Sequence, residues 1–283
     1  MKPIAGAVVL FLLALTGFSQ PTAAPPADAA PAPVPVPSAK DLLRDVVAQL
    51  PRDPLLIDGD IVVRKQHGVV ARELKFDMTL NWGAEPAMAR YRIMDALGKD
   101  LEEMTFRRSA GVAPQVSYVI GGNRMADPPS LAANIQSTDI TWMDLSLSFL
   151  WWGNGTILRS ERIRGRTCYV VEVPAPASPP RVDAAAGAYA KVLLWIDADL
   201  HMMLQAEGYG RDGKALRTLW IKSLKKIKGR WMIKDLEVQE TAAAHRTKMT
   251  VRDVRLNGES VGDEPSAPGG EAGEALQMEG GSP

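Results

Sequence analysis

The stretch Asp139–Trp152, DITWMDLSLSFLWW, decides how the rest of this 283-residue chain is interpreted. It places three tryptophans, a phenylalanine and three leucines within fourteen residues. Exposing that much apolar surface to water is unfavourable, so something must cover it. Two interpretations follow: the stretch is a plug inside an ordinary core, or it faces an apolar ligand.

The local pattern of this stretch favours a helix. Thr141 and Asp144 have the spacing of a capping box, in which each side chain bonds the backbone N–H of the other. The apolar residues that share one helical face are spaced 3, 4 and 3: Trp142, Leu145, Phe149 and Trp152. Because Leu147 and Leu150 cover much of the remainder, such a helix would be buried on both sides. Leu145–Phe149 also alternates like a strand, and that alternative stays open.

Strand patterns flank the stretch on both sides. Before it, β-rich or alternating runs occur near residues 60–66, 69–82, 87–95 and 100–107. After it, the three long consecutive runs cover roughly residues 214–226, 229–241 and 245–257. Glycines stand at many of the breaks, where hairpin turns need positive φ. No spacing suggests helical crossovers, so the sequence predicts an antiparallel sheet rather than a parallel one.

A second helix is predicted over Ser38–Leu50. Ser38 can cap it, and Asp41 in the first turn suits the helix dipole. Its apolar residues form one stripe: Leu42, Leu43, Val46, Val47 and Leu50. Pro51 and Pro54 then end the helix, because the residue before a proline avoids the helical conformation.

The first residues have the pattern of an export signal. Met1-Lys2 is a short basic start, and Ile4–Phe18 is an apolar run followed by small residues. We therefore predict a signal peptide over residues 1–24, and an Ala/Pro-rich linker over 25–37. A retained N-terminal anchor is the alternative, although the run is short for a membrane span of about 20 residues.

The remaining sequence predicts one domain and a tail. Residues 38–257 are enough to bury a sizeable core. Residues 258–283 are rich in glycine, glutamate, serine and proline, a composition typical of disordered, acidic Gly-rich tails. The net charge is zero, so the chain lacks the basic field that binding to nucleic acid requires. Cys168 is the only cysteine, which excludes an intramolecular disulfide.

No catalytic or metal-binding pattern is recognisable. The chain has no nucleophile elbow, no zinc-protease motif and no phosphate-binding loop. His67, His201 and His245 lie far apart, and none has a partner at metal-ligand spacing. We therefore predict a protein that is not an enzyme, with no cofactor and no metal site.

Several pieces of the chain, in their order, resemble a known family. They are Ser137–Ser146 (STDITWMDLS), Thr167–Glu172 (TCYVVE), Tyr189–Asp197 (YAKVLLWID) and the terminal strands through Asn257. This order is similar to that of the LolA-like periplasmic outer-membrane lipoprotein-sorting family, in its broad, largely uncharacterised branch. The resemblance covers about residues 38–257.

The resemblance implies an α+β fold. In this fold a strongly curved antiparallel sheet, an incomplete barrel, is covered on its concave face by helices that act as a lid. The N-terminal helix and the 129–152 segment would be the lid, and the cavity beneath would hold acyl chains. The residues we expect to contact that ligand are Trp142, Leu145, Leu147, Phe149, Leu150 and Trp152 of the lid, and Tyr91, Met94 and Trp195 of the sheet. The competing interpretation is that they fill an ordinary sheet core.

The function that follows is a soluble, monomeric periplasmic carrier or binder of lipoprotein or lipid acyl chains. An inner- or outer-membrane protein is a possible partner in such a role. A different class is an envelope-stress sensor or regulatory scaffold that resembles RseB and binds a membrane partner. Its partner surfaces would be the tail and a basic hairpin, whose charged residues are Lys222, Lys225, Lys226, Lys228 and Arg230. A third is an envelope hydrolase, which a pocket without convergent polar groups would contradict.

Overall fold

The computed structural model describes residues 37–50, 52–109, 114–176, 189–227, 230–257 and 259–260. The predicted signal peptide, nearly all of the predicted linker and residues 261–283 of the tail lie outside this part. Within it, no helix has the length and apolar character needed to cross a membrane.

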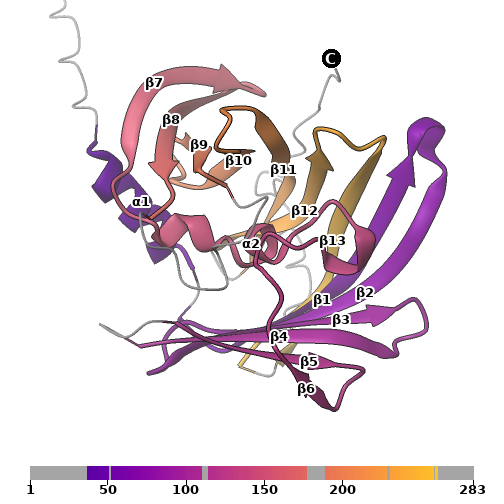
Figure 1. Ribbon diagram of the computed structural model, residues 1–283. Helices are drawn as coiled ribbons and strands as arrows, with labels where there is room; N and C mark the ends of the chain where they lie inside the picture. The colour runs from indigo at the N-terminus through magenta and orange to yellow at the C-terminus, as the bar shows by residue number, and fades with distance from the viewer. Residues whose placement is uncertain are drawn as a thin grey trace, which may run out of the picture. The chain divides into compact units, whose positions relative to one another are not determined.

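A single antiparallel sheet of fourteen strands dominates the described residues (Figure 1). The strand order runs β6-β5-β4-β3-β2-β1-β13-β12-β11-β10-β9-β8-β7, with β14 paired to β13. Its first half comprises β1 (Leu55–Lys65), β2 (Val70–Asn81), β3 (Ala87–Asp95), β4 (Asp100–Arg108), β5 (Gln115–Ile120) and β6 (Arg124–Ala126). Its second half comprises β7 (Thr156–Ile163), β8 (Arg166–Pro174), β9 (Lys191–Asp197), β10 (Met203–Tyr209), β11 (Ala215–Ile227), β12 (Arg230–Glu240), β13 (His245–Leu256) and β14 (Glu259–Ser260). The predicted strand runs and the terminal meander are confirmed.

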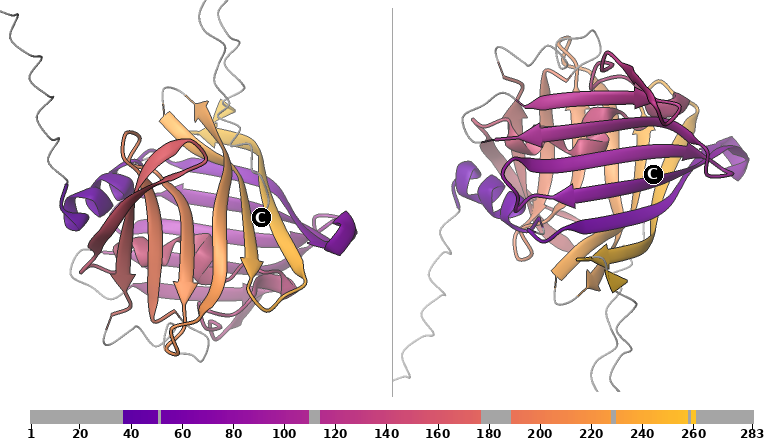
Figure 2. Two further views of the ribbon diagram at one scale, coloured as in Figure 1. Left: turned by 90° about the horizontal axis from the view of Figure 1, so that it is seen from above. Right: turned by 90° about the horizontal axis from the view of Figure 1, so that it is seen from below.

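The sheet is strongly curved and remains open, because β6 and β7 are its two edges and do not pair (Figures 1 and 2). Its two halves are joined by the pairing of β1 with β13. Ile61 of β1 stands between Leu74 and Met249, and all three side chains are buried. Successive side chains of a strand point to opposite faces of the sheet. Every second side chain therefore points to the concave face, where the core lies.

The N-terminal helix α1 (Ala39–Ala48) confirms the helix predicted over Ser38–Leu50. Its cap is Ser38, whose hydroxyl accepts a hydrogen bond from the Asp41 backbone N–H at 3.1 Å. The helix lies against β7 and the neighbouring helical turn η3 (Ser148–Trp151). Gly155 permits this approach, since a Cβ there would stand 2.8 Å from a methyl group of Leu43.

Residues 127–155, between β6 and β7, form an inner segment around which the sheet curls (Figure 2). Its helical pieces are η2 (Ile135–Ser137), α2 (Trp142–Ser146) and η3; the remaining short helix, η1 (Gln66–Gly68), lies in the β1–β2 turn. The predicted capping box is present, with Asp144 N–H donating to Thr141 Oγ1 at 3.1 Å and Thr141 N–H to Asp144 Oδ2 at 3.0 Å.

The predicted continuous helix through Trp152 is wrong, and so is the strand alternative. Leu147 adopts the left-handed conformation (φ 50°, ψ 34°), which ends α2 after five residues and begins η3 in a new direction. In a straight helix the apolar side chains would form one fixed stripe. The turn at Leu147 changes the direction of the chain, and Phe149 and Leu150 after it are buried in the core. Of the two predicted lid elements, residues 129–152 are therefore part of a broken inner segment that lies inside the curve of the sheet, and α1 lies against β7 and η3.

Candidate ligand-binding cavity

An apolar cavity of about 190 Å³ lies between the concave face of the sheet and the inner segment. The sheet contributes Ile57, Met78, Tyr91, Ile221 and Met249, which come from five strands. This volume exceeds the ~150 Å³ of an engineered apolar cavity that binds benzene, and it is smaller than the ~300–1,000 Å³ typical of sites for drug-sized ligands.

Methionines are prominent in the wall of this cavity. They are Met78, Met202, Met203, Met232 and Met249. Methionine is unbranched and polarizable, so its side chain adapts to apolar ligands of varying shape. Few polar residues reach the wall, and one of them, His201, lies 3.3 Å from Asp45 of α1. Among the described residues, no cluster of histidine, cysteine and carboxylate side chains could hold a metal ion.

The structure places four of the nine predicted ligand residues in the cavity wall: Tyr91, Leu145, Leu147 and Leu150. Trp142 and Phe149 are each only 1% exposed and lie in the core instead. The Trp142 ring meets Tyr118 edge-on, with ring centroids 6.1 Å apart. Trp152 is half-buried against Phe149 and is not part of the wall. These three aromatic residues support the wall rather than form it.

Met94 and Trp195 lie outside the cavity, and strand alternation explains why. On β3, Met94 follows Ile93 and takes the face opposite to Tyr91. On β9, Trp195 similarly takes the face opposite to Leu194, and its indole Nε1 donates a hydrogen bond to Glu161. The alternation of side chains along this strand could be read from the sequence, and it would have placed Met94 and Tyr91 on opposite faces.

The cavity wall also contains three tryptophans that are not among the nine predicted ligand residues: Trp82, Trp151 and Trp231. Trp82 at the end of β2 and Trp151 of η3 pack with ring centroids 5.2 Å apart. Trp151 is off the helical face predicted for this stretch. It reaches the wall because the chain turns at Leu147, and no sequence signal marked that turn.

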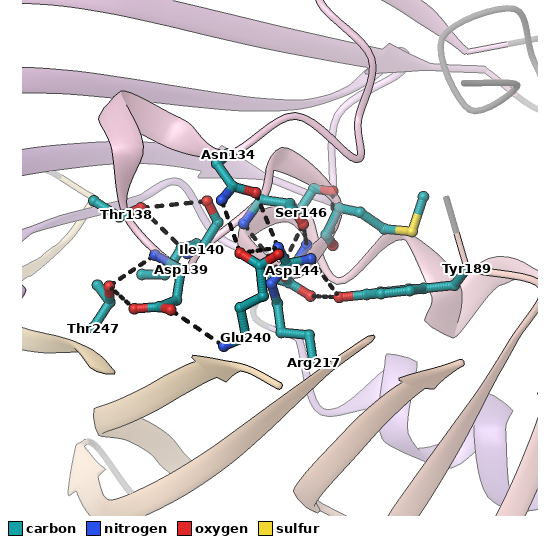
Figure 3. A network of polar contacts seen from close by, with 12 residues as sticks. Asn134, Thr138, Asp139, Ile140, Asp144, Ser146, Tyr189, Arg217, Glu240 and Thr247 are labelled. Atoms are coloured by element: carbon teal, nitrogen blue, oxygen red, sulfur yellow. Dashed lines mark hydrogen bonds and ion pairs between the residues drawn. The ribbon is translucent and has the colours of Figure 1, made fainter. Parts of the chain in front are cut away.

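A buried polar network fixes the inner segment to the second half of the sheet (Figure 3). At its centre, the Asp144 carboxylate, 4% exposed, caps α2 and accepts a hydrogen bond from the Tyr189 hydroxyl at 2.7 Å. Tyr189 fits beside β10 because residue 208 is glycine: a Cβ there would stand 2.2 Å from the Tyr189 ring. Burial, followed by the Asp144 charge, raises the pKa of Tyr189 well above its usual value.

Arg217 of β11 is the cation of this network and is 5% exposed. Its guanidinium lies 3.8 Å from Asp144 and 3.5 Å from Glu240, and it donates to the Asn134 side-chain oxygen at 2.9 Å. Burial alone would lower the pKa of Arg217, but Tyr189 and Asp144 raise it on balance. A buried charge of this kind is tolerable only when it is paired and hydrogen-bonded.

Asp139 makes a second attachment, to β12 and β13. Its side chain is fully buried and accepts hydrogen bonds from the Thr247 hydroxyl at 2.7 Å and the Glu240 backbone N–H at 3.2 Å. His245 Nδ1 lies 2.8 Å from the same carboxylate. Asp139 and Asp144 thus attach the inner segment to the sheet.

Comparisons with known proteins agree with this architecture. A family model whose description reads "Uncharacterized protein" matches residues 124–261. No curated protein matches the chain.

Three solved structures share its fold. A DUF1329 family protein from Desulfovibrio piger superposes with a TM-score of 0.62 at 14% identity, over 77% of this chain and 91% of that one. A putative outer membrane lipoprotein-sorting protein domain from Vibrio parahaemolyticus gives 0.61 at 13% identity, over 76% and 91%. A LolA superfamily protein from Nitrosomonas europaea gives 0.57 at 16% identity, over 78% and 94%. At such identities the likeness concerns the fold, and it confirms the predicted LolA-like resemblance at that level.

Proposed function

Starting from a LolA-like fold with an apolar cavity in its concave face, we propose that this protein binds and carries acyl chains of lipids or lipoproteins, without catalysis. The observation that carries the proposal is the cavity itself. It is lined mainly by aliphatic, methionine and aromatic side chains, and the inner segment forms one of its walls. Apolar pockets with few polar groups bind their ligands mainly through the hydrophobic effect.

The size of the cavity favours an occupant with one acyl chain. About 190 Å³ is of the same order as the ~150 Å³ of a cavity that holds one benzene molecule, so the space suits one chain and not several. A ligand with three chains would need the inner segment to move outward.

The energetics suit transfer between membranes. Moving a chain from water into an apolar site gains about 0.8 kcal/mol per methylene, so three long chains would exceed any known affinity. The relevant starting state is therefore a membrane, in which the chains are already dry. Exchange from membrane to cavity is then nearly balanced, and a small conformational bias sets its direction.

The place of action in this proposal is the periplasm. It rests on the export pattern over residues 1–24 and on the predicted single domain over residues 38–257. The mature protein would act there as a soluble monomer, and an inner- or outer-membrane protein would deliver or receive the lipid.

Solvent extraction of the purified protein, combined with displacement of a fluorescent fatty acid, tests the proposal. We expect co-purified lipid in the extract and displacement of the probe by added lipid. Met232→Glu, which puts a charge in the cavity wall, should weaken probe binding at least tenfold. The matched control is Met94→Glu, a half-buried strand methionine outside the wall, which should leave binding unchanged. No bound lipid and no displacement in the wild type would contradict the proposal.

A further inference from the structure

A second, smaller cavity of about 30 Å³ adjoins the first. The two share Trp82, Tyr91, Ser146 and Trp151, so they lie on either side of the same tryptophan pair. The small cavity has room for about two or three waters. Its lining combines one charged side chain with alanine, proline, serine and aromatic residues.

That cation is Arg108, the last residue of β4, on the same face of the strand as Met104. Its guanidinium carbon lies 4.7 Å from the centre of the Trp151 ring. Within the described residues, no carboxylate lies within ion-pair distance of Arg108, whereas Arg92 on the neighbouring strand pairs with Asp77. Burial lowers the pKa of Arg108, which reflects the cost of holding an unpaired charge there.

Two further residues that line this small cavity carry a donor without a hydrogen-bond partner. The indole Nε1 of Trp82 and the hydroxyl of Ser148 are both buried and unpaired. Leaving such a group unsatisfied costs about 1–3 kcal/mol. An anion in the small cavity would provide an acceptor for both groups and a counter-charge for Arg108.

We infer that the small cavity binds the carboxylate of an acyl-chain ligand whose tail occupies the large cavity. This rests on the proposed function and narrows it to single-chain carboxylate amphiphiles. A carboxylate matches the planar guanidinium with two parallel hydrogen bonds, and its size suits a space of two or three waters. A phosphodiester carrying further substituents is too large for that space. The Trp82–Trp151 pair stands where the head of the ligand meets its tail.

Hexadecanoate and hexadecanol have chains of the same length and differ in the head group. Comparing their affinities therefore isolates the contribution of the head group. We expect the wild type to bind hexadecanoate about tenfold more tightly or better, as a hydrogen bond to a charged group predicts. Arg108→Gln should remove this preference and leave hexadecanol binding unchanged. Arg107→Gln is the control, because Arg107 is the exposed neighbour on the opposite face of β4 and should keep the preference.

Trp82→Phe keeps an aromatic side chain but removes the indole N–H donor, and it should reduce the preference about threefold, which preserves the test if Arg108→Gln does not fold. Equal wild-type affinity for acid and alcohol would overturn the inference and leave the proposed function standing. Preference for a single-chain phosphate lipid, lost in Arg108→Gln, would overturn the carboxylate assignment. If neither hexadecanoate nor hexadecanol binds, the proposed function itself fails.

Discussion

The two halves of the inner segment are held in different ways. The anchored half, residues 134–146, is attached through Asp139 and Asp144 to four strands or their ends by buried hydrogen bonds and ion pairs (Figure 3). The cavity half, residues 147–152, makes only local backbone hydrogen bonds among the described contacts and packs through Leu150, Trp151 and other apolar side chains.

This difference shows how one segment can be both fixed and adaptable. Hydrogen bonds between buried charges require particular distances and angles, so the anchored half has one position. Apolar packing has no direction, so the cavity half can shift by small amounts while it stays buried. Leu147 joins the two halves at a left-handed turn, and this residue itself lines the cavity. The half of the inner segment that would contact the proposed ligand is thus the half that is held by apolar packing rather than by buried hydrogen bonds.

The largest expected effect comes from breaking the anchor. Arg217→Met leaves Asp144 buried without its cation, which typically costs about 3–5 kcal/mol of unfolding free energy. Denaturant titration measures this loss. Arg246→Met removes a pair with Glu237 in which the arginine is half exposed, and it should cost less than about 1 kcal/mol. If the two variants were equally stable, the anchored half would not be held by its charges.

A pair of glycine substitutions examines the junction between the halves. Leu150→Gly should cost roughly 3 kcal/mol or more, because it empties a buried leucine position in a helical turn. Leu147→Gly should cost at least about 1 kcal/mol less, since glycine adopts the positive φ of residue 147 without strain. Thermal unfolding of both variants measures the difference. A greater loss for Leu147→Gly would mean that the left-handed turn carries no strain.

Thr247→Val examines the second attachment of the anchored half. The hydroxyl of Thr247 donates to the Asp139 carboxylate and accepts from the Asp139 backbone N–H at 2.9 Å. Removing it leaves the buried Asp139 backbone N–H without an acceptor and the carboxylate with one hydrogen bond fewer, so we expect a loss of about 1–3 kcal/mol. Thr79→Val is the control, because Thr79 bonds Arg90 at a partly exposed position. Hydrogen exchange should rise first in residues 134–141, and a rise confined to 147–152 would contradict the attachment.

The smallest effect is a dependence on alkaline pH. The pKa of Tyr189 is raised in the folded state, so its contribution to stability is complete below the unfolded value of about 10 and is lost as pH rises above it. When unfolding releases one proton, the free energy of unfolding falls by about 1.4 kcal/mol per pH unit. Between pH 10 and 11 the wild type should therefore lose stability more steeply than Tyr189→Phe, by up to this amount. Parallel stability curves for the two proteins would show that Tyr189 is not buried against Asp144.

Part of the cavity wall was predicted from the sequence, and the differences have identifiable causes. The Thr141–Asp144 spacing predicted the cap of α2 correctly, because that contact is local. The continuous helix was wrong because the backbone of Leu147 adopts a conformation that leucine rarely takes and that only packing can impose. Trp142 and Phe149 were assigned to the ligand from their apolar character and their place in the predicted lid, and neither distinguishes a cavity wall from the core behind it.

The anchoring network was not predictable in this way. Arg217, Tyr189 and Asp144 are separated by long stretches of sequence, and each alone resembles an ordinary polar residue of a strand, loop or helix cap. The space for Tyr189 depends on the missing side chain at Gly208, which the sequence does not connect to either residue. Arg108 was likewise inconspicuous, since its lack of an acidic partner is a property of the folded arrangement.

The sequence by itself determined the antiparallel strands, the two helix caps and the apolar inner segment between two groups of strands. These features depend on contacts between residues close in the chain and on periods of two and 3.6, which can be read directly from residue order. Only the tertiary structure decided which apolar residues line a cavity and which polar residues meet. Those outcomes depend on the curvature of the sheet and on the pairing of β1 with β13, which bring together residues nearly 200 positions apart.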